Sequence, residues 1–131
     1  MEVLDKFSAG RTGILLLIAL LAAAHQVPAQ QAISLFNEYS NRIYQVRIVE
    51  QASGKQAALG SGFQISHDGV VVTNYHVVSE FTSHPGRYRI EYLGHDGARG
   101  EMQLIDIDVI NDLALLKKED YGGSYLELAG T

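Results

Sequence analysis

The chain contains no cysteine among its 131 residues and has only two prolines. The lack of cysteine excludes thiol catalysis, disulfide bonds and thiolate zinc sites together. Stability must therefore rest on an apolar core. The lack of cysteine says nothing about the cellular compartment, because reducing and oxidising compartments both accept such a chain.

Positive charge is also scarce. The chain has ten Lys and Arg and fifteen Asp and Glu, which gives a net charge of −5, and the basic residues are scattered along the chain. Proteins that bind nucleic acid concentrate Lys and Arg on one face, so we expect no such partner. With 47% hydrophobic and 19% charged residues, the composition is that of one small globular domain. The 13 glycines favour a β protein rich in turns.

Residues 14–24 form an uninterrupted apolar run, preceded by two basic residues and followed by a segment that contains Ala29. This order is typical of a secretory signal peptide, which we expect over residues 1–29, with cleavage after Ala29 or alternatively after Ala24. The run is shorter than the roughly 20 residues that span a bilayer. An uncleaved membrane anchor and a buried helix remain as alternatives. The predicted destination is export, to the periplasm and cell envelope or beyond.

The rest of the chain has the pattern of a small antiparallel β-barrel or sandwich. Alternation of apolar and polar residues, β-branched content and flanking glycines predict six short strands. They cover residues 42–49, 59–66, 70–74, 87–93, 101–110 and 113–117. A helical lead-in is expected over residues 30–41, and one short helical turn with a loop over residues 77–85.

His76 and Asp112 are the candidate catalytic residues. His76 follows a run of valines and a threonine, so a rigid, buried backbone should hold it, as a general base requires. Asp112 precedes an apolar run, where a carboxylate is costly unless it is paired, as is the carboxylate that orients a triad histidine. The plainer alternatives are a core histidine bonded to a backbone carbonyl and a turn aspartate that caps its own backbone. Asp106 and Asp108 compete with Asp112 for the orienting role.

Four segments, taken in order, resemble the trypsin-like serine proteases, and most closely their HtrA (Deg-type) branch. They are Gly-Ser-Gly-Phe at residues 60–63, Asp-Gly at 68–69, Val-Thr-Asn-Tyr-His-Val-Val at 72–78 and Asn-Asp-Leu-Ala-Leu-Leu-Lys at 111–117. The glycines of the first segment allow close backbone approach or a bulge, although a hairpin turn alone would also explain them.

This resemblance, which runs from about Tyr44 to Lys117, implies an all-β fold. Residues 42–131 would form the six-stranded antiparallel N-terminal barrel of a two-barrel protease domain, preceded by a signal-peptide helix. It also implies a serine-type endopeptidase that acts on peptide bonds of envelope proteins. His76 would be its general base and Asp112 its orienting carboxylate.

The resemblance does not extend to a nucleophile. The family places its serine in a segment like Gly-Asn-Ser-Gly-Gly on a second barrel, and nothing here matches it. Ser124 follows two glycines, but Tyr125 succeeds it, so we interpret it as a loop serine. We therefore expect an incomplete protease domain, inactive alone, without a cofactor or metal. The expected partners are polypeptide substrates. A membrane tether through the apolar segment and a homo-oligomer formed through residues 30–41 stay open.

Two other functions are compatible with the same residues. The first is a non-catalytic, exported β-barrel that serves as a binding or scaffold protein, whose uncovered apolar patch would mark a partner site. The second is a metal site, because His67, His76, His84 and His95 lie within thirty residues. Their spacing lacks the paired-ligand pattern of a zinc enzyme, which disfavours the second function.

Overall fold

The computed structural model describes residues 27–120 and 122–130, and the chain divides into two units between Glu38 and Tyr39. Helix α2 spans Val27–Tyr39 and includes most of the segment expected to be a helical lead-in. All but the last three residues of the expected signal peptide lie outside the described residues. Within residues 27–120 and 122–130, no helix has the length and apolar content needed to cross a membrane.

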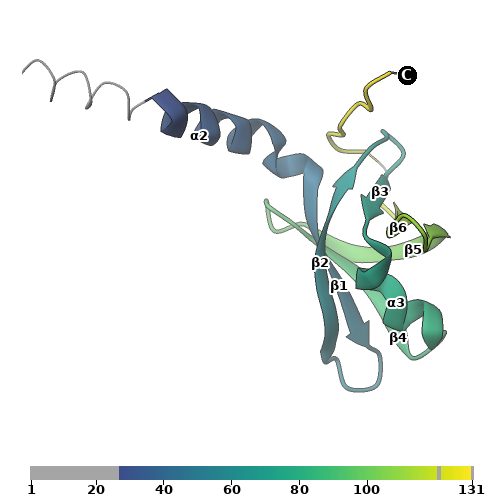
Figure 1. The fold of residues 1–131 in the computed structure, drawn as a ribbon. Coiled ribbons are helices and arrows are strands. Elements are labelled where there is room, and N and C mark those ends of the chain that lie inside the picture. The colour runs from purple at the N-terminus through teal and green to yellow at the C-terminus, as the bar shows by residue number, and fades with distance from the viewer. Residues whose placement is uncertain (1–26, 121, 131) are drawn as a thin grey trace, which may run out of the picture. The chain divides into compact units, whose positions relative to one another are not determined.

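The second unit is a closed antiparallel barrel of six strands, in the order β1-β2-β3-β6-β5-β4 (Figure 1). A short 3-10 helix, Ser40–Arg42, leads into it. The strands are β1 (Ile43–Glu50), β2 (Gln56–Gln64), β3 (Val70–Thr73), β4 (Tyr88–Gly94), β5 (Arg99–Asp108) and β6 (Leu113–Lys118). The pairing of β1 with β4 closes the barrel, which confirms the predicted all-β barrel and rules out the sandwich.

Alternation along the strands fills the barrel interior. Tyr44, Val46 and Ile48 of β1 are buried in the core, while Ile43 and Gln45 remain exposed. The same alternation places every second residue of β4 and β6 in the core. The fully buried side chains of β1, β3, β4 and β6 make this one continuous core, which is the main source of stability for a chain without disulfides.

Helix α3 differs from its prediction in length and position. It spans Tyr75–Ser83, where we expected only one helical turn after residue 77. The valines form the predicted strand, but β3 ends at Thr73, one residue earlier than expected. His76 lies in the first turn of the helix that follows. Val77 and Val78 bury the inner face of α3 against the barrel core. This burial stabilises a helix that is too short to be stable in isolation.

Glycines in β2 allow α3 to pack closely against the barrel. A Cβ atom at Gly60 would lie 2.9 Å from Cγ1 of Val77 and closer still to its Cγ2. A Cβ atom at Gly62 would lie 2.8 Å from Cγ1 of Val71. Close backbone approach, the first of the alternatives for this segment, therefore explains the two glycines, and it positions the helix that carries His76.

Candidate active site

The antiparallel pairing of β3 with β6 brings His76 and Asp112 together. Thr73, the last residue of β3, pairs with Ala114 near the start of β6. Continuing this register past the ends of both strands places the residues after Thr73 beside those before Leu113. The ladder does continue by one hydrogen bond, in which the backbone N–H of Tyr75 donates to the carbonyl of Asp112 at 3.1 Å. Two residues 36 positions apart in sequence thus become neighbours.

The carboxylate of Asp112 contacts His76 through both of its oxygens. Oδ2 lies 2.7 Å from Nδ1 of the imidazole, and Oδ1 accepts the backbone N–H of His76 at 2.8 Å. The second bond satisfies one of the unpaired N–H groups at the start of α3, where the N-cap residue Asn74 makes no side-chain cap. The side chain of Asn74 instead donates to the carbonyl of Asp112 at 3.1 Å. Asp112 therefore fixes both the backbone and the ring of His76.

These bonds also determine the tautomer. The backbone and then the side-chain hydrogen bonds from His76 lower the pKa of Asp112 below its usual 3.8, so the carboxylate is ionised at neutral pH. An ionised carboxylate only accepts hydrogen bonds, so Nδ1 of a neutral imidazole must carry the proton. The lone pair of that imidazole is then on Nε2, which makes no hydrogen bond to the described residues.

The pair is open to solvent. The side chain of His76 is 71% exposed and that of Asp112 is 45% exposed. The structure thus excludes the alternative of a buried core histidine, and it also differs from the expectation that Asp112 is a buried acceptor. Leu113, the next residue, is exposed as well, so nothing in the described part of the chain covers this end of the β3–β6 pair.

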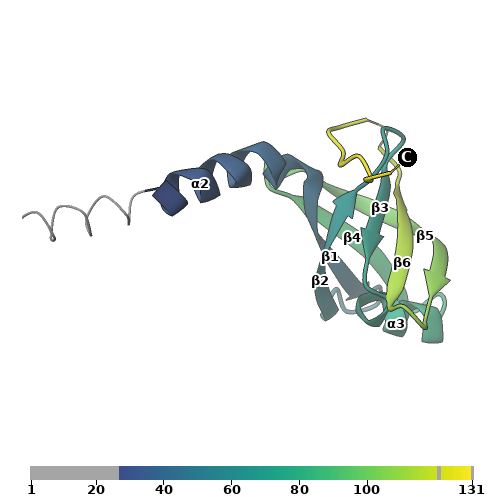
Figure 2. The ribbon, with the colours of Figure 1, turned by 45° about the horizontal axis from the view of Figure 1, so that its top comes forward.

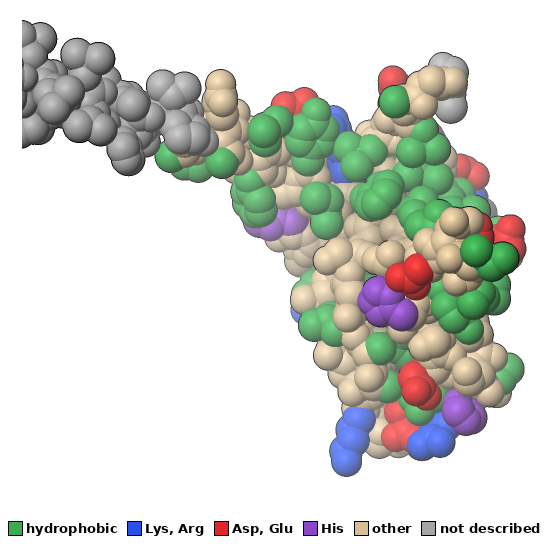
Figure 3. Space-filling view, viewed as in Figure 1, with side chains coloured by type: hydrophobic (Ala, Val, Ile, Leu, Met, Phe, Trp, Pro, Cys, Tyr) green, Lys and Arg blue, Asp and Glu red, His purple; other side chains and the backbone are tan. Residues whose placement is uncertain are grey.

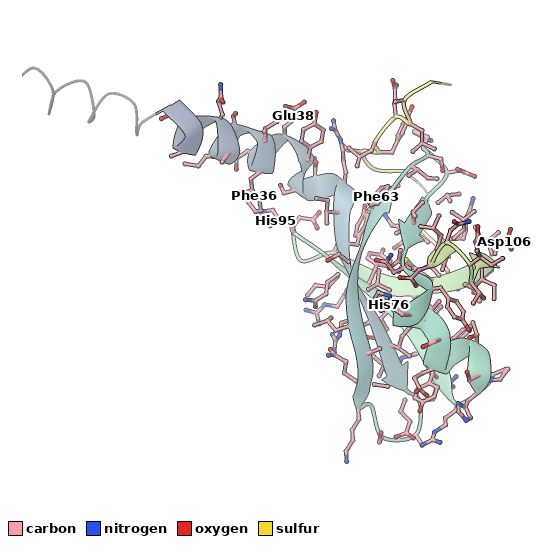
Figure 4. The ribbon with its side chains drawn as sticks, in the orientation of Figure 1. Phe36, Glu38, Phe63, His76, His95 and Asp106 are labelled. Carbon is pink, nitrogen blue, oxygen red and sulfur yellow. The ribbon has the colours of Figure 1, made fainter. Side chains whose placement is uncertain are left out.

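The competing aspartates have other partners. Asp106 accepts the backbone N–H of Ile107 at 2.8 Å, and Asp108 accepts two bonds from Asn111. Figure 4 labels His76 at the start of α3 and Asp106 on β5. Of the three candidates, Asp112 alone bonds to His76 within the described residues. The alternative role considered for Asp112 was to cap the backbone of its own turn. Asp108 fills that role instead.

An apolar groove of about 360 Å³ lies on the β3–β6–β5 side of the barrel. Figures 2 and 3 show these three strands and the hydrophobic side chains gathered over them. The groove includes Leu113, the neighbour of Asp112, and Leu128 of the C-terminal segment. Its other lining residues are mostly aliphatic: Ile65, Val72, Ile107, Ala114 and Leu115, with Asp106 and Asp108.

Ser124 does not approach the pair. It lines a polar pocket of about 350 Å³ together with Lys118, at the opposite end of β6 from Asp112. Three of the histidines considered as metal ligands, His67, His84 and His95, are exposed. No group of three or more His, Cys, Asp or Glu side chains within residues 27–120 and 122–130 is arranged to hold a metal ion.

A buried lysine near Ser124 was not predicted. Lys118 is 7% exposed, and its Nζ donates to the hydroxyl of Tyr44 at 3.0 Å and to Oε1 of Gln64 at 3.3 Å. It also lies 4.5 Å and 5.1 Å from the ring centroids of Tyr44 and Tyr92. Burial, followed by the bond to Asp120, raises the pKa of Tyr92 to about 12. The inward alternation of β6, extended by one residue, could have placed Lys118 in the core.

The fold agrees with comparisons to known proteins. The sequence profile of the family described as "Trypsin-like peptidase domain" matches residues 60–131. Over 106 residues, the chain is 31% identical to a probable periplasmic serine endoprotease DegP-like of Chlamydia pneumoniae, covering 79% of this chain and 20% of that protein. It is 41% identical over 61 residues to the serine protease HTRA1 of Xenopus laevis, covering 47% of this chain and 12% of that protein.

Solved structures give the same result. The crystal structure of Deg5 superposes with a TM-score of 0.64 at 28% identity, covering 79% of this chain and 49% of that chain. The serine endoprotease of Yersinia pestis superposes with a TM-score of 0.52 at 25% identity, covering 63% of this chain and 27% of that one. The barrel is thus one of the type found in serine proteases. The chain belongs to the trypsin-like peptidase family, in its HtrA branch, and spans a small part of the curated relatives it matches.

Proposed function

We propose that this chain supplies the general base and the orienting carboxylate of a serine endopeptidase that cleaves polypeptides. The observation that carries the proposal is the 2.7 Å contact between Nδ1 of His76 and Oδ2 of Asp112. It leaves Nε2 unbonded among the described residues and open to solvent, on a barrel of the trypsin-like family. A general base needs this combination of a fixed ring and an accessible lone pair.

In the proposed mechanism, Nε2 of His76 takes the proton of a serine hydroxyl as its oxygen attacks a peptide carbonyl. The same nitrogen then returns the proton to the departing amine. Asp112 remains ionised throughout. It keeps the ring in the Nδ1–H tautomer and stabilises the imidazolium that forms when the proton arrives. The bond from the backbone N–H of His76 to Oδ1 keeps the carboxylate aligned through both steps.

The nucleophile of the proposed enzyme comes from polypeptide outside these 131 residues. Ser124 lies in the pocket of Lys118, and no serine hydroxyl in residues 27–120 or 122–130 bonds to Nε2 of His76. The apolar groove that includes Leu113 supports this proposal, because a groove of this character beside an exposed catalytic pair suits a docked domain. The chain spans only 49% of the Deg5 chain, which leaves room for such a domain.

The proposed location is the periplasm or cell envelope, with polypeptides there as substrates. The matched DegP-like relatives of Chlamydia pneumoniae and Rickettsia conorii carry the word "periplasmic" in their names. The sequence pattern of residues 1–29 is consistent with export.

The coding sequence beyond codon 131 tests this function. An in-frame Gly-x-Ser-Gly-Gly segment is expected, and the polypeptide that includes it should hydrolyse a denatured protein substrate. Replacing His76 with Ala should abolish that hydrolysis while leaving the fold, read by circular dichroism, unchanged. A stop codon in an intact locus, or full activity in His76→Ala, would refute the proposal.

The apolar groove supports a second candidate, a non-catalytic exported barrel that binds another protein. In that case the groove would be covered by a partner, and the His76–Asp112 bond would serve only to cap α3. Analytical ultracentrifugation of the chain without detergent separates the candidates in part. A monomer with no tendency to associate would count against a binding role that depends on the groove.

A further inference from the structure

The turn that delivers Asp112 to His76 has an unusual backbone. Asp108, the last residue of β5, pairs with Leu113, the first residue of β6, so residues 109–112 form the connecting turn. Asp112 closes the turn with φ of 54°, and it is the only non-glycine residue with positive φ in the described part of the chain. Few L-residues adopt this left-handed region, and aspartate is among those that do so more often, with local hydrogen bonds to support it.

Asp108 makes the contacts that fold this turn. Its Oδ1 accepts the backbone N–H of Asn111 at 3.1 Å, and its Oδ2 accepts the side-chain amide of Asn111 at 2.7 Å. The backbone N–H of Ile110 also bonds the Asp108 carboxylate, whereas the bond from the N–H of Asp112 to the carbonyl of Val109 is long at 3.4 Å. The two bonds from Asn111 lower the pKa of Asp108, so its carboxylate is charged and accepts strongly at neutral pH.

We propose that Asp108 is a positioning residue: by clamping Asn111, it holds Asp112 in the left-handed conformation from which both carboxylate oxygens reach His76. This inference rests on the proposed function, in which the orientation of His76 matters for catalysis. Asp108 does not contact the imidazole within the described residues, and it acts only through the turn. Substitution of Asp108 should therefore disturb the contact between His76 and Asp112 while the barrel stays folded.

Asp106 provides a matched control. It lies on the same strand, two residues earlier, is exposed like Asp108 and carries the same charge. Its single hydrogen bond goes to the next backbone N–H, that of Ile107, and does not reach the turn. Loss of Asp106 removes one negative charge from the same region without removing the clamp. The two variants thus separate positioning from a general electrostatic effect.

The test is the tautomer of His76 in the chain, read by two-bond ¹H–¹⁵N correlation of ¹⁵N-labelled protein. The spectra are recorded well above the usual imidazole pKa of about 6.5, so that the ring is neutral. In the unmodified chain the Nδ1–H tautomer should dominate. In Asp108→Ala the share of the Nε2–H tautomer should rise severalfold, toward that of an unrestrained imidazole. In Asp106→Ala it should stay as in the unmodified chain.

The inference is overturned if Asp108→Ala keeps the Nδ1–H preference, or if Asp106→Ala loses it equally. Should Asp108→Ala fail to fold, Asp108→Asn replaces it. Its side-chain amide keeps one acceptor oxygen, so the share of the Nε2–H tautomer should rise less than in Asp108→Ala but should still exceed that of the unmodified chain. A merely structural role for Asp108 would lower stability without moving the tautomer in the folded protein. Failure of the proposed function has a different readout, because hydrolysis of a denatured protein by the polypeptide that carries the nucleophile would then be unchanged in His76→Ala, whatever the tautomer of His76.

Discussion

The two ends of strand β6 carry polar clusters that differ in burial and in what they leave unpaired. At one end, next to Leu113, the pair of Asp112 and His76 is open to solvent. At the other end, Lys118 is buried against the rings of Tyr44 and Tyr92 and bonds to Tyr44 and Gln64. In the exposed cluster, Nε2 of the imidazole is available to accept a hydrogen bond, whereas in the buried cluster the polar groups bond to one another.

Under the proposed function, the exposed cluster serves chemistry and the buried cluster serves the fold. An exposed ion pair contributes little to stability because solvent screens it. A buried polar group must be satisfied or its burial destabilises the protein, so the groups around Lys118 are expected to matter for folding. Substitutions at the two ends should therefore separate activity from stability.

The largest effect is expected at the exposed end. In the polypeptide that carries the nucleophile, Asp112→Asn should lower kcat by about 10⁴-fold, because the amide no longer enforces the Nδ1–H tautomer. Lys118→Met, at the other end, should leave kcat within a factor of about two, since the exposed pair contributes its chemistry independently. Steady-state hydrolysis of an unfolded protein substrate measures both. A similar loss in the two variants would contradict the separation of the two ends.

The contact between α3 and β2 comes next. Gly60→Ala places a methyl group against Val77, and overpacking of this kind costs about 1–3 kcal/mol in the free energy of unfolding. Urea denaturation measures the cost. The control is Ser61→Ala, whose exposed side chain makes no contact that holds α3, although its backbone carbonyl accepts the hydroxyl of Thr73. Equal stabilities for the two variants would show that the close approach at Gly60 is unimportant.

At the buried lysine, the cost in the free energy of unfolding should depend on the shape of the replacement. Lys118→Ala removes the stem and the charge that lie against two rings and should cost about 1–3 kcal/mol. Lys118→Met keeps the stem, and the hydroxyl of Tyr44 still bonds Gln64 at 3.1 Å, so it should cost less than about 1 kcal/mol.

Lys117 provides the matched control for Lys118. Its Nζ pairs with Asp68 at 2.7 Å on the surface, so Lys117→Ala should cost about 0–1 kcal/mol. Thermal and urea denaturation compare the three variants. If Lys117→Ala proves as destabilising as Lys118→Ala, burial is not the reason why the second cluster matters.

The pH dependence should be the smallest effect. Hydrogen bonds from His76 lower the pKa of Asp112, so its contribution to stability is fully present above the unfolded pKa near 3.8 and is lost as pH falls through the folded value. For Asp68, the bond from Lys117 lowers the pKa to about 2, so that contribution persists to more acidic pH. Urea denaturation of Asp112→Asn and Asp68→Asn below pH 4 should show shallower acid losses than the unmodified chain, with Asp68 acting over the lower range.

Much of the barrel could be predicted from local patterns. Alternation over residues 42–49 and Asp-Gly turns reflect the strand period and hairpin geometry, which are properties of neighbouring residues. The nine-residue helix α3 could not be predicted, because its stability comes from burying Val77 and Val78 in a core assembled from distant strands.

The candidate site divides in the same way. Histidine and aspartate could be selected by residue type and by their place beside apolar runs. Residue type could not decide among Asp106, Asp108 and Asp112, and only the family resemblance favoured Asp112. The contact with His76 depends on the β3–β6 register and on the backbone conformation of one turn. Only the geometry distinguishes the two aspartates, since Asp108 bonds within the turn and Asp112 contacts His76.

The most direct test of the account is labelling by a fluorophosphonate probe, which reacts with activated serines. The polypeptide encoded by the complete reading frame would be compared with its His76→Ala and Lys118→Met variants. We expect labelling of a serine outside residues 1–131 that disappears in His76→Ala and persists in Lys118→Met. Absence of labelling in the unmodified polypeptide, or labelling that survives His76→Ala, would contradict the claim that His76 and Asp112 form the working end of a serine endopeptidase.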